Sequence, residues 1–264
     1  MLEAQTLAEE TWLYRDLAWA WGQAGALPQA QQALTRAEMA LENTKAILYK
    51  RQGDFEAALI HLERAVDLAQ AQRDWGQLLR ARNNRAAIYR ELEQYDDALA
   101  EYRHNLTLSI QTDELVAQAI TALNLGICHL WKTSPDPAAA IRRETEALEL
   151  FEELGDITGA FLAHTNLAEA HLAAGDLAAV QQHAETGLAH CDPPFRAHSC
   201  AERYRLCAEI HLALGTCEAA SEHLERAQHL IYPHGLTESP LDQAIAQRIA
   251  EAQAKLQQYL SERR

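Results

Sequence analysis

Cysteine and histidine side chains gather in the C-terminal third of the sequence at spacings that suit a metal ion. Cys207 and His211 are four residues apart, Cys200 precedes Cys207 by one heptad, and His190 and Cys191 come shortly before. Residues four and seven apart share one face of a helix, and thiolates and imidazoles are ligands of zinc. The alternative is that Cys207 and His211 fill a helical core, where cysteine acts as a small hydrophobe. We favour the core and predict neither a metal nor another cofactor.

Sequence patterns of hydrolytic or phosphoryl chemistry are absent. There is no HExxH, no GxSxG and no glycine-rich loop ending in GK[ST]. Those motifs would supply a zinc-bound water, a serine nucleophile or a phosphate cradle. Paired acids such as Asp96-Asp97 and Glu152-Glu153 fall where a solvated helix face is expected. We therefore predict a protein that is not an enzyme.

Composition and charge limit the remaining classes of protein. Of the 264 residues, 48% are hydrophobic and 6% aromatic, with 11 glycines and 7 prolines, which favours helices over sheets. The net charge of −15 opposes nucleic-acid binding, which needs a basic surface. The first residues, MLEAQTLAEETW, lack the pattern of a signal peptide, and no apolar run is long enough for a membrane span. We predict a cytoplasmic protein that is not bound to a membrane, and whose five cysteines are reduced thiols.

The elements that position these residues follow a repeat. A large residue before Ala or Gly, with a ring three positions later, recurs at intervals of 40 residues and once of 42, where WKTSPDP (131–137) inserts two residues. The five copies are Lys45-Ala46 with Tyr49, Arg85-Ala86 with Tyr89, Leu125-Gly126 with His129, Leu167-Ala168 with His171, and Cys207-Ala208 with His211. Glycine followed by Asp or Thr often comes next, which suits a helix end and the cap of a following helix. Each copy is therefore predicted to be a pair of helices.

This pattern resembles the tetratricopeptide repeat (TPR), in the version of roughly 40 residues found in kinesin light chains, spindle-orientation adaptors and bacterial regulators. The resemblance rests on the paired residues above, on Tyr49 and Tyr89, and on recurring alanines, namely Ala58, Ala65, Ala98, Ala140, Ala147, Ala220 and Ala227. It implies an all-α, right-handed α-solenoid of about five helix pairs with capping helices at both ends, about twelve helices in all. His129, His171 and His211 replace the tyrosine of the family, and we expect them to pack in the core.

The repeats are predicted to form a single superhelical domain over 1–264. It begins with an N-terminal capping region (2–38), which contains a capping helix over 2–24. One long helix over 28–52 then opens the first full repeat. The repeats cover 39–74, 75–114, 115–156, 157–194 and 195–234. A C-terminal capping helix follows over 238–262, with Pro240 at its start.

The resemblance implies that the first helix of each repeat lines a concave groove. Asn84, Asn124 and Asn166 hold the same slot in three successive repeats, about 100° around the helix from the core stripe. One amide can bond both the N–H and the C=O of a peptide unit, and first helices about 10 Å apart match about three residues of extended chain. We predict that this column grips a peptide backbone. The alternative is a column of solvated polar side chains.

Other side chains of the expected groove change in character along it. Its N-terminal part has Asn43, Lys50, Arg51, Arg80, Asn83 and Arg90. Its middle is apolar with Ile120, Leu123, Ile127 and Trp131, and its C-terminal part has Arg205 among Glu169, Glu202 and Glu209. Arginine is the favoured partner of a carboxylate. The basic end is therefore predicted to take an acidic side chain or a C-terminal carboxylate. Alternatively, Arg80 and Arg90 pair with neighbouring glutamates.

These features predict a non-catalytic adaptor or receptor that binds a protein or peptide segment in its concave groove. The arginine-rich, lysine-poor composition is typical of bacterial proteins, and bacterial proteins of this type are often regulators. The alternative is a structural scaffold that self-assembles through its outer faces or end caps. Both a monomer and a homodimer are compatible with the sequence.

Overall fold

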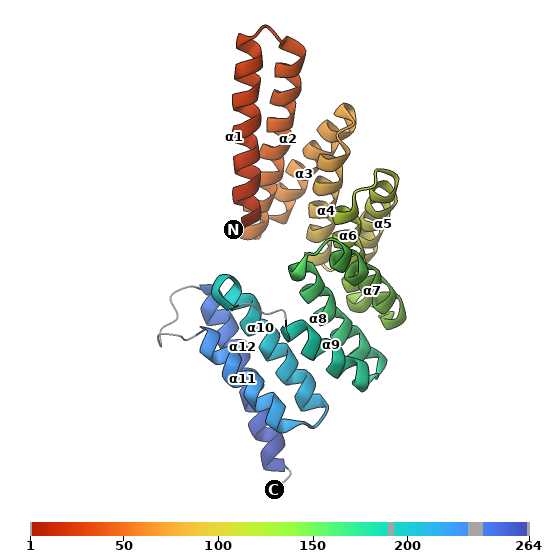
Figure 1. The fold of residues 1–264 in the computed structure, drawn as a ribbon, viewed down its shortest axis with the longest axis vertical. Coiled ribbons are helices and arrows are strands. Elements are labelled where there is room, and N and C mark those ends of the chain that lie inside the picture. The colour runs from red at the N-terminus through yellow and green to blue at the C-terminus, as the bar shows by residue number, and fades with distance from the viewer. Residues whose placement is uncertain (1, 190–192, 232–239, 263–264) are drawn as a thin grey trace. The chain divides into compact units, whose positions relative to one another are not determined.

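The computed structural model describes residues 2–189, 193–231 and 240–262, and within these ranges it contains twelve helices and no strand (Figure 1). The chain divides into two compact units, which we call the N-terminal unit (Met1–Ser134) and the C-terminal unit (Pro135–Arg264). The boundary falls inside the WKTSPDP segment, where the repeat interval changes. None of the described helices has the length and the apolar character needed to cross a bilayer.

The N-terminal unit is built from helices that each pack on the next. They are α1 (Leu2–Gln23), α2 (Leu27–Gln52), α3 (Phe55–Gln72), α4 (Trp75–Glu91), α5 (Tyr95–Gln111) and α6 (Leu115–Trp131). The long helices α1 and α2 lie side by side (Figure 1). The first helices of successive pairs also meet, because α4 contacts both α2 and α6. Ala58, Ala65 and Ala98 are completely buried, and such small side chains allow neighbouring helix axes to approach closely.

The C-terminal unit continues the same construction. It contains α7 (Pro137–Glu153), α8 (Ile157–Ala174), α9 (Leu177–Ala189), α10 (Pro193–Ala213), α11 (Cys217–Ile231) and α12 (Pro240–Glu262). The last helix, α12, packs on both α10 and α11. Its side chains Ile245, Ile249, Ala252 and Leu256 form one helical stripe and are buried in the core that α10 and α11 contribute to.

The turns between helices follow the local sequence. In the α2–α3 turn, Gly53 has a left-handed backbone (φ 79°), and its N–H donates to the Lys50 carbonyl at 3.0 Å. Asp54 then caps α3, because its carboxylate accepts from the Ala57 N–H at 3.0 Å. The same Gly-Asp arrangement joins α8 to α9. The dipeptide therefore marks helix ends in both units.

The cysteines are not all reduced, contrary to the sequence-based prediction. Cys128, Cys207 and Cys217 are free, but Cys200 is disulfide-bonded. Cys191 lies outside the described residues. The prediction was wrong because it relied on an odd number of widely spaced cysteines, and sequence spacing does not show which thiols meet in space.

Candidate functional site

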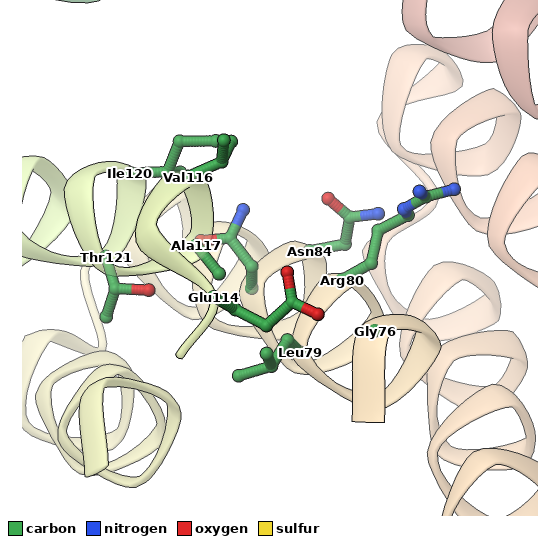
Figure 2. A pocket seen from close by; sticks show the side chains of 10 residues that line it. Gly76, Leu79, Arg80, Asn84, Glu114, Val116, Ala117, Ile120 and Thr121 are labelled. Atoms are coloured by element: carbon green, nitrogen blue, oxygen red, sulfur yellow. The ribbon is translucent and has the colours of Figure 1, made fainter. Parts of the chain in front are cut away.

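A pocket of about 410 Å³ opens between α4 and α6 in the N-terminal unit (Figure 2). The residues that line it are Gly76, Leu79, Arg80, Asn83 and Asn84 from α4, Glu114 just before α6, and Val116, Ala117, Ile120 and Thr121 from the first turns of α6. Four side chains predicted for the groove thus lie together, namely Arg80, Asn83, Asn84 and Ile120. The pocket is therefore the candidate functional site of this unit.

The polar wall of the pocket is positioned by the burial of α4. Leu78 and Ala81 pack in the core, which turns the opposite, polar face of the helix towards the pocket. The start of the helix is held by Asp74, whose carboxylate accepts from the Gln77 N–H at 3.2 Å and from Arg36 Nε of α2 at 2.9 Å. The wall is therefore part of a packed helix with a capped end.

The apolar wall of the pocket comes from the first turns of α6. Val116 and Ile120 are one helical turn apart, and they are 55% and 37% exposed. Figure 2 shows them across the pocket from Arg80 and Asn84. Two branched aliphatic side chains left in water beside a polar wall can hold an apolar group of a ligand.

The asparagines of the predicted column in this unit are bonded to other asparagines. Asn84 Nδ2 donates to Asn43 Oδ1 at 3.4 Å, and Asn124 Nδ2 donates to Asn83 Oδ1 at 3.2 Å. Each bond joins neighbouring first helices. Asn43 is completely buried and donates to the Met39 carbonyl at 3.2 Å. Since an amide has two donors and two acceptor sites, Asn84 retains a carbonyl oxygen and one N–H for a ligand.

The other residues predicted for the groove in this unit do not line the pocket. Lys50 and Arg90 share Glu91, with Nζ 3.5 Å and Nη2 4.0 Å from its Oε1. Ile127 and Trp131 lie further along α6, and Trp131 is 59% exposed. Arg90 Nη1 also donates to Asn124 Oδ1 at 3.0 Å, so both Lys50 and Arg90 have partners within the chain.

In the C-terminal unit, the predicted residues Asn166 and Arg205 bind neighbouring acids. Asn166 Nδ2 donates to Glu144 Oε1 at 3.1 Å, and Arg205 Nη1 donates to Glu209 Oε2 at 2.7 Å. Glu144 is only 1% exposed. Burial raises the pKa of this carboxyl well above its ordinary value; the bond from Asn166 opposes the rise and the charge of Glu169 adds to it. Asn166 therefore stabilises the ionised form of the buried Glu144 by a hydrogen bond.

The cysteine and histidine residues considered for zinc have separate contacts. Burial raises the pKa of the Cys207 thiol to about 12, and its sulfur lies 3.8 Å from a backbone carbonyl of α9. His211 Nδ1 is 2.9 Å from the Thr216 hydroxyl. Both are buried, as the core interpretation predicts. No three His, Cys, Asp or Glu side chains in the described ranges are arranged to hold a metal ion, and His190 and Cys191 lie outside those ranges.

Charge is separated between the helices of the N-terminal unit. The first helices of the pairs (α2, α4 and α6) together carry eight Lys or Arg and three Asp or Glu. The second helices, α3 and α5, together carry two Arg and six Asp or Glu. In the C-terminal unit, α8 and α10 carry three of each sign. On a chain of net charge −15, the pocket therefore adjoins a locally basic helix, α4, with four arginines and one glutamate.

Glu114 and Val116 are pocket residues that the sequence analysis missed. A signal for Glu114 is present, because it stands 40 residues after Asp74, which caps α4. The repeat interval therefore identifies the start of α6 from that of α4. Nothing comparable identifies Val116, because its exposure depends on how α6 packs.

Comparisons with known proteins agree with this architecture. A family model described as tetratricopeptide repeat matches residues 37–104 and 77–153. No curated protein sequence matches the chain.

Several solved structures share the fold. BtubC (BKLC) from P. vanneervenii has a TM-score of 0.64 at 21% identity, over 90% of this chain and 93% of that one. A signal transduction ATPase with numerous domains (STAND protein) from Pyrococcus horikoshii, which has a tetratricopeptide repeat sensor, has a TM-score of 0.66 at 18% identity. That match covers 93% of this chain but 37% of the other. Kinesin light chain-like TPR repeats from Podosopora anserina reach 0.57 at 17% identity, over 74% of this chain and 93% of that one. At these identities the similarity is one of fold.

The fold and the pocket define an all-α protein of repeated helix pairs. Residues 37–153 match the tetratricopeptide repeat model, and the helix-pair fold is similar to that of solved TPR structures. Repeats of this family are generally non-catalytic and serve protein–protein interaction.

Proposed function

We propose that this protein is a non-catalytic adaptor that binds an extended, acidic segment of another protein in the pocket between α4 and α6. The observation that carries the proposal is the excess of positive charge on α2 and α4, next to the exposed side chains of Val116 and Ile120. A regulatory role in a bacterial cytoplasm belongs to the same proposal.

Each wall of the pocket takes a different part of the ligand. Asn84 offers an N–H and a carbonyl oxygen to the ligand backbone, and Arg80, the arginine of α4 that lines the pocket, attracts its carboxylates. Val116 and Ile120 contact an aliphatic side chain. Glu114 repels acidic groups from its end of the pocket, so an acidic side chain is directed towards α4.

One similar protein supports the regulatory part of this proposal. The TPR portion of the P. horikoshii protein is described as a sensor. A TPR array that senses a ligand has to bind it, and any response of the present chain would pass to a partner protein through the same kind of contact. The similarity is one of fold, so the ligand itself is inferred from the pocket.

Fluorescence anisotropy with short labelled peptides tests the proposal. The probes are glutamate-rich peptides with one leucine at varied positions, and the same peptides with lysine in place of each glutamate. The acidic peptides are expected to bind at least about tenfold more tightly, and added salt is expected to weaken their binding. Equal affinity for both peptide sets would contradict the proposal.

Two pocket variants and one matched control make the test specific to this site. Asn84→Ala and Ile120→Asp are each expected to weaken peptide binding about tenfold while the thermal unfolding temperature changes little, because neither side chain is buried. Ile110→Asp on α5 introduces the same charge at a side chain that is 60% exposed and outside the pocket. Binding that is unchanged by Ile120→Asp, or is lost equally with Ile110→Asp, argues against this pocket.

A second candidate function, self-assembly, is favoured by apolar side chains on α1 and α2. Four leucines of α2 recur at intervals of seven and are at least 40% exposed, namely Leu27, Leu34, Leu41 and Leu48. Trp12 and Trp19 on α1 have the same interval and are 59% and 71% exposed. Leucines in a heptad pattern are typical of helices that pair, whereas the ends of repeat arrays usually have polar outer faces.

Light scattering over a wide range of protein concentration tests this second candidate. If the leucines pair two copies, the wild type dimerises and the double variant Leu34→Glu/Leu41→Glu is monomeric. A wild type that is monomeric at every concentration rules the scaffold out. Ile120→Asp serves as the control, because it changes the pocket and leaves α2 intact.

A further inference from the structure

Three helix pairs share a stack of rings that was not part of the sequence analysis. In each pair, a histidine of the second helix stacks on a ring of the first helix twelve residues before it. The ring centroids are 5.3 Å apart at 9° for Tyr49 and His61, 5.4 Å at 19° for His171 and His183, and 5.0 Å at 29° for His211 and His223. The first ring of each stack is the tyrosine or histidine that recurs three positions after the Ala of the repeat.

A second side chain of the first helix, seven residues before the ring, also contacts the histidine. In α2 it is Glu42, with Oε2 2.6 Å from His61 Nδ1, and in α8 it is His164, with Nδ1 3.0 Å from His183 Nδ1. In α10 it is Tyr204, whose ring centroid lies 5.8 Å from that of His223. The geometry is shared, but only Glu42 can balance a positive charge on its histidine.

His183 is held between α8 and α9 by other imidazoles. Because its Nδ1 is 3.0 Å from that of His164, one ring must donate an N–H and the other must accept it. A proton on both rings would place two cations in contact. Burial and the charges of His164 and His171 lower the pKa of His183 to about 4. Asp176, in the turn, lies 3.6 Å from His171 Nδ1 and is exposed.

Two acids, buried Glu144 on α7 and partly buried Glu169 on α8, respond to pH in the opposite direction. Burial raises the pKa of Glu144 on α7 and of Glu169 on α8, so both are easier to bury at low pH. On α10, the charges of Arg203 and Arg205 oppose the rise in the pKa of Glu169, and the charge of Glu209 adds to it. The contribution of the histidines to the pH dependence of stability must therefore be measured as a difference between the wild type and a histidine variant, because both proteins contain these acids and their effects cancel.

His223 is in a similar position between α10 and α11. Its pKa is lowered to about 4, first by burial and then by the charges of His211 and Arg226. The charged or titratable groups that face it are His211 and Tyr204 on α10, Glu185 on α9, and Glu222 and Arg226 on α11, while Lys255 of α12 pairs with Glu209. The acids Glu185 and Glu222 oppose the decrease without cancelling it.

We propose that the C-terminal unit is an acid-sensitive switch, in which protonation of His183 and His223 opens α9 and α11 away from α8 and α10. An added proton puts a cation among rings, with no carboxylate in contact to receive it, so the closed packing is lost. In the pair of α2 and α3, by contrast, the Glu42 carboxylate lies 2.6 Å from His61 Nδ1 and can balance a positive charge on that ring. This inference does not depend on the proposed binding pocket.

The direction of the pH dependence follows from the pKa values. Those of His183 and His223 are about 4 in the folded chain and 6.5 for the unperturbed group, so the unfolded chain binds more protons between these values. The contribution of each histidine to stability is fully present above about pH 6.5 and is lost as the pH falls towards about 4. For half-buried rings, we expect each to raise the unfolding constant of this unit at least about tenfold by about pH 5.

Tryptophan fluorescence separates the two units in the full chain. All five tryptophans, Trp12, Trp19, Trp21, Trp75 and Trp131, lie in the N-terminal unit, whereas circular dichroism follows the helices of both units. Urea unfolding of the wild type and of His183→Phe/His223→Phe is compared at about pH 7.5 and about pH 5. Phenylalanine keeps a stacking ring and cannot be protonated. The fall in pH is expected to raise the unfolding constant seen by circular dichroism about a hundredfold more in the wild type than in the variant. The fluorescence transition is expected to respond alike in both proteins.

A matched control and a measurement on the wild type keep the proposal falsifiable. His229→Gln changes an exposed histidine of α11 and is expected to behave as the wild type. If the phenylalanine variant does not fold, NMR titration of the wild-type histidines replaces it. Two rings with pKa values below about 5, and loss of helical signal as they titrate, are expected. An equal pH response of wild type and variant, or titration of every histidine near pH 6.5, would overturn the proposal.

Discussion

Two buried glutamates, one in each unit, differ in the sign of their pKa shift. Glu42 is 2% exposed and Glu144 is 1% exposed. Burial alone raises the pKa of Glu42, but bonds from His61 at 2.6 Å and Lys45 at 2.9 Å reverse the effect and lower it. Glu144 accepts from a neutral amide, and its Oε2 has no hydrogen-bond partner among the described residues, so its pKa is raised. At equal burial, the charge of the partner decides whether the ionised form is stable.

The same difference extends to the two units. In the N-terminal unit, a carboxylate faces the stacked histidine and the first helices are basic. In the C-terminal unit, a histidine and a tyrosine occupy the place that Glu42 has in the N-terminal unit, and α8 and α10 together have no net charge. The repeat places side chains at equivalent positions, and the residue type at each position then sets its chemistry. The two proposals therefore concern different units, peptide binding the N-terminal unit and acid sensitivity the C-terminal unit.

Glycines in the first turns of α4 and α8 provide a sharp test of packing in the two units. A Cβ on Gly159 would overlap the ring of buried Phe151 of α7, whereas on Gly76 it would lie 3.8 Å from Asp74 Oδ1. We expect Gly159→Ala to lower the free energy of unfolding by about 3 kcal/mol. Gly76→Ala is expected to be neutral or to raise it by up to about 1 kcal/mol, because alanine favours the helix. Urea unfolding followed by circular dichroism measures both. A neutral Gly159→Ala would show that α7 and α8 are less closely packed than described.

Replacing each buried glutamate by glutamine is expected to have opposite effects at pH 7. Glu42→Gln removes the charge that His61 and Lys45 bind, and should lower the free energy of unfolding by about 2 kcal/mol. Glu144→Gln removes an acid that is costly to ionise, and should raise it by about 1 kcal/mol. Urea unfolding followed by tryptophan fluorescence reports the first variant and circular dichroism the second.

The pH dependence of these two variants checks the sign of each shift. The contribution of the Glu42 carboxylate is present above its ordinary pKa of 4.5 and is lost as the pH falls further. The cost of Glu144 is present at pH 7 and disappears as the pH falls towards 4.5. The advantage of Glu144→Gln should therefore vanish near pH 4.5. Glu38→Gln, at a half-exposed glutamate of α2, is the control and should change stability by less than about 0.5 kcal/mol. Two variants with the same sign at pH 7 would contradict the assignment.

The helix ends offer a smaller contrast between the units. The N-terminal unit has non-glycine residues with a left-handed backbone at Arg73, Glu93 and Asp113, whereas α8 ends at Gly175. Arg73→Gly is expected to raise the free energy of unfolding by roughly 0.5 kcal/mol, because it removes steric strain. Gly175→Ala is expected to lower it by about 1 kcal/mol, because alanine is strained at this φ. Thermal unfolding measures both. A loss of stability in Arg73→Gly would mean that the arginine side chain contributes more than its backbone costs.

Much of the helix pattern was predictable from local sequence. The long helix expected over 28–52 is α2 (Leu27–Gln52), and the helix expected from Pro240 is α12 (Pro240–Glu262). The pocket was predictable in part, because Arg80, Asn83 and Asn84 share one helix face. The wall that α6 contributes was predicted only in part. Ile120 was expected there, but Val116 was not, because the exposure of Val116 depends on how α6 packs on a second helix.

Spacing along the chain was enough to specify the fold class, because a period of 40 residues and small side chains at fixed slots act through local helix geometry. It also identified Cys207 and His211 as core residues. The bond between Asn166 and Glu144, the opposite pKa shifts of Glu42 and Glu144, and the histidine stacks depended on tertiary packing. Each of these involves atoms on different helices a few ångströms apart. The free energy of a buried charge depends on such distances and on the polarity of the partner, and a one-dimensional pattern contains neither.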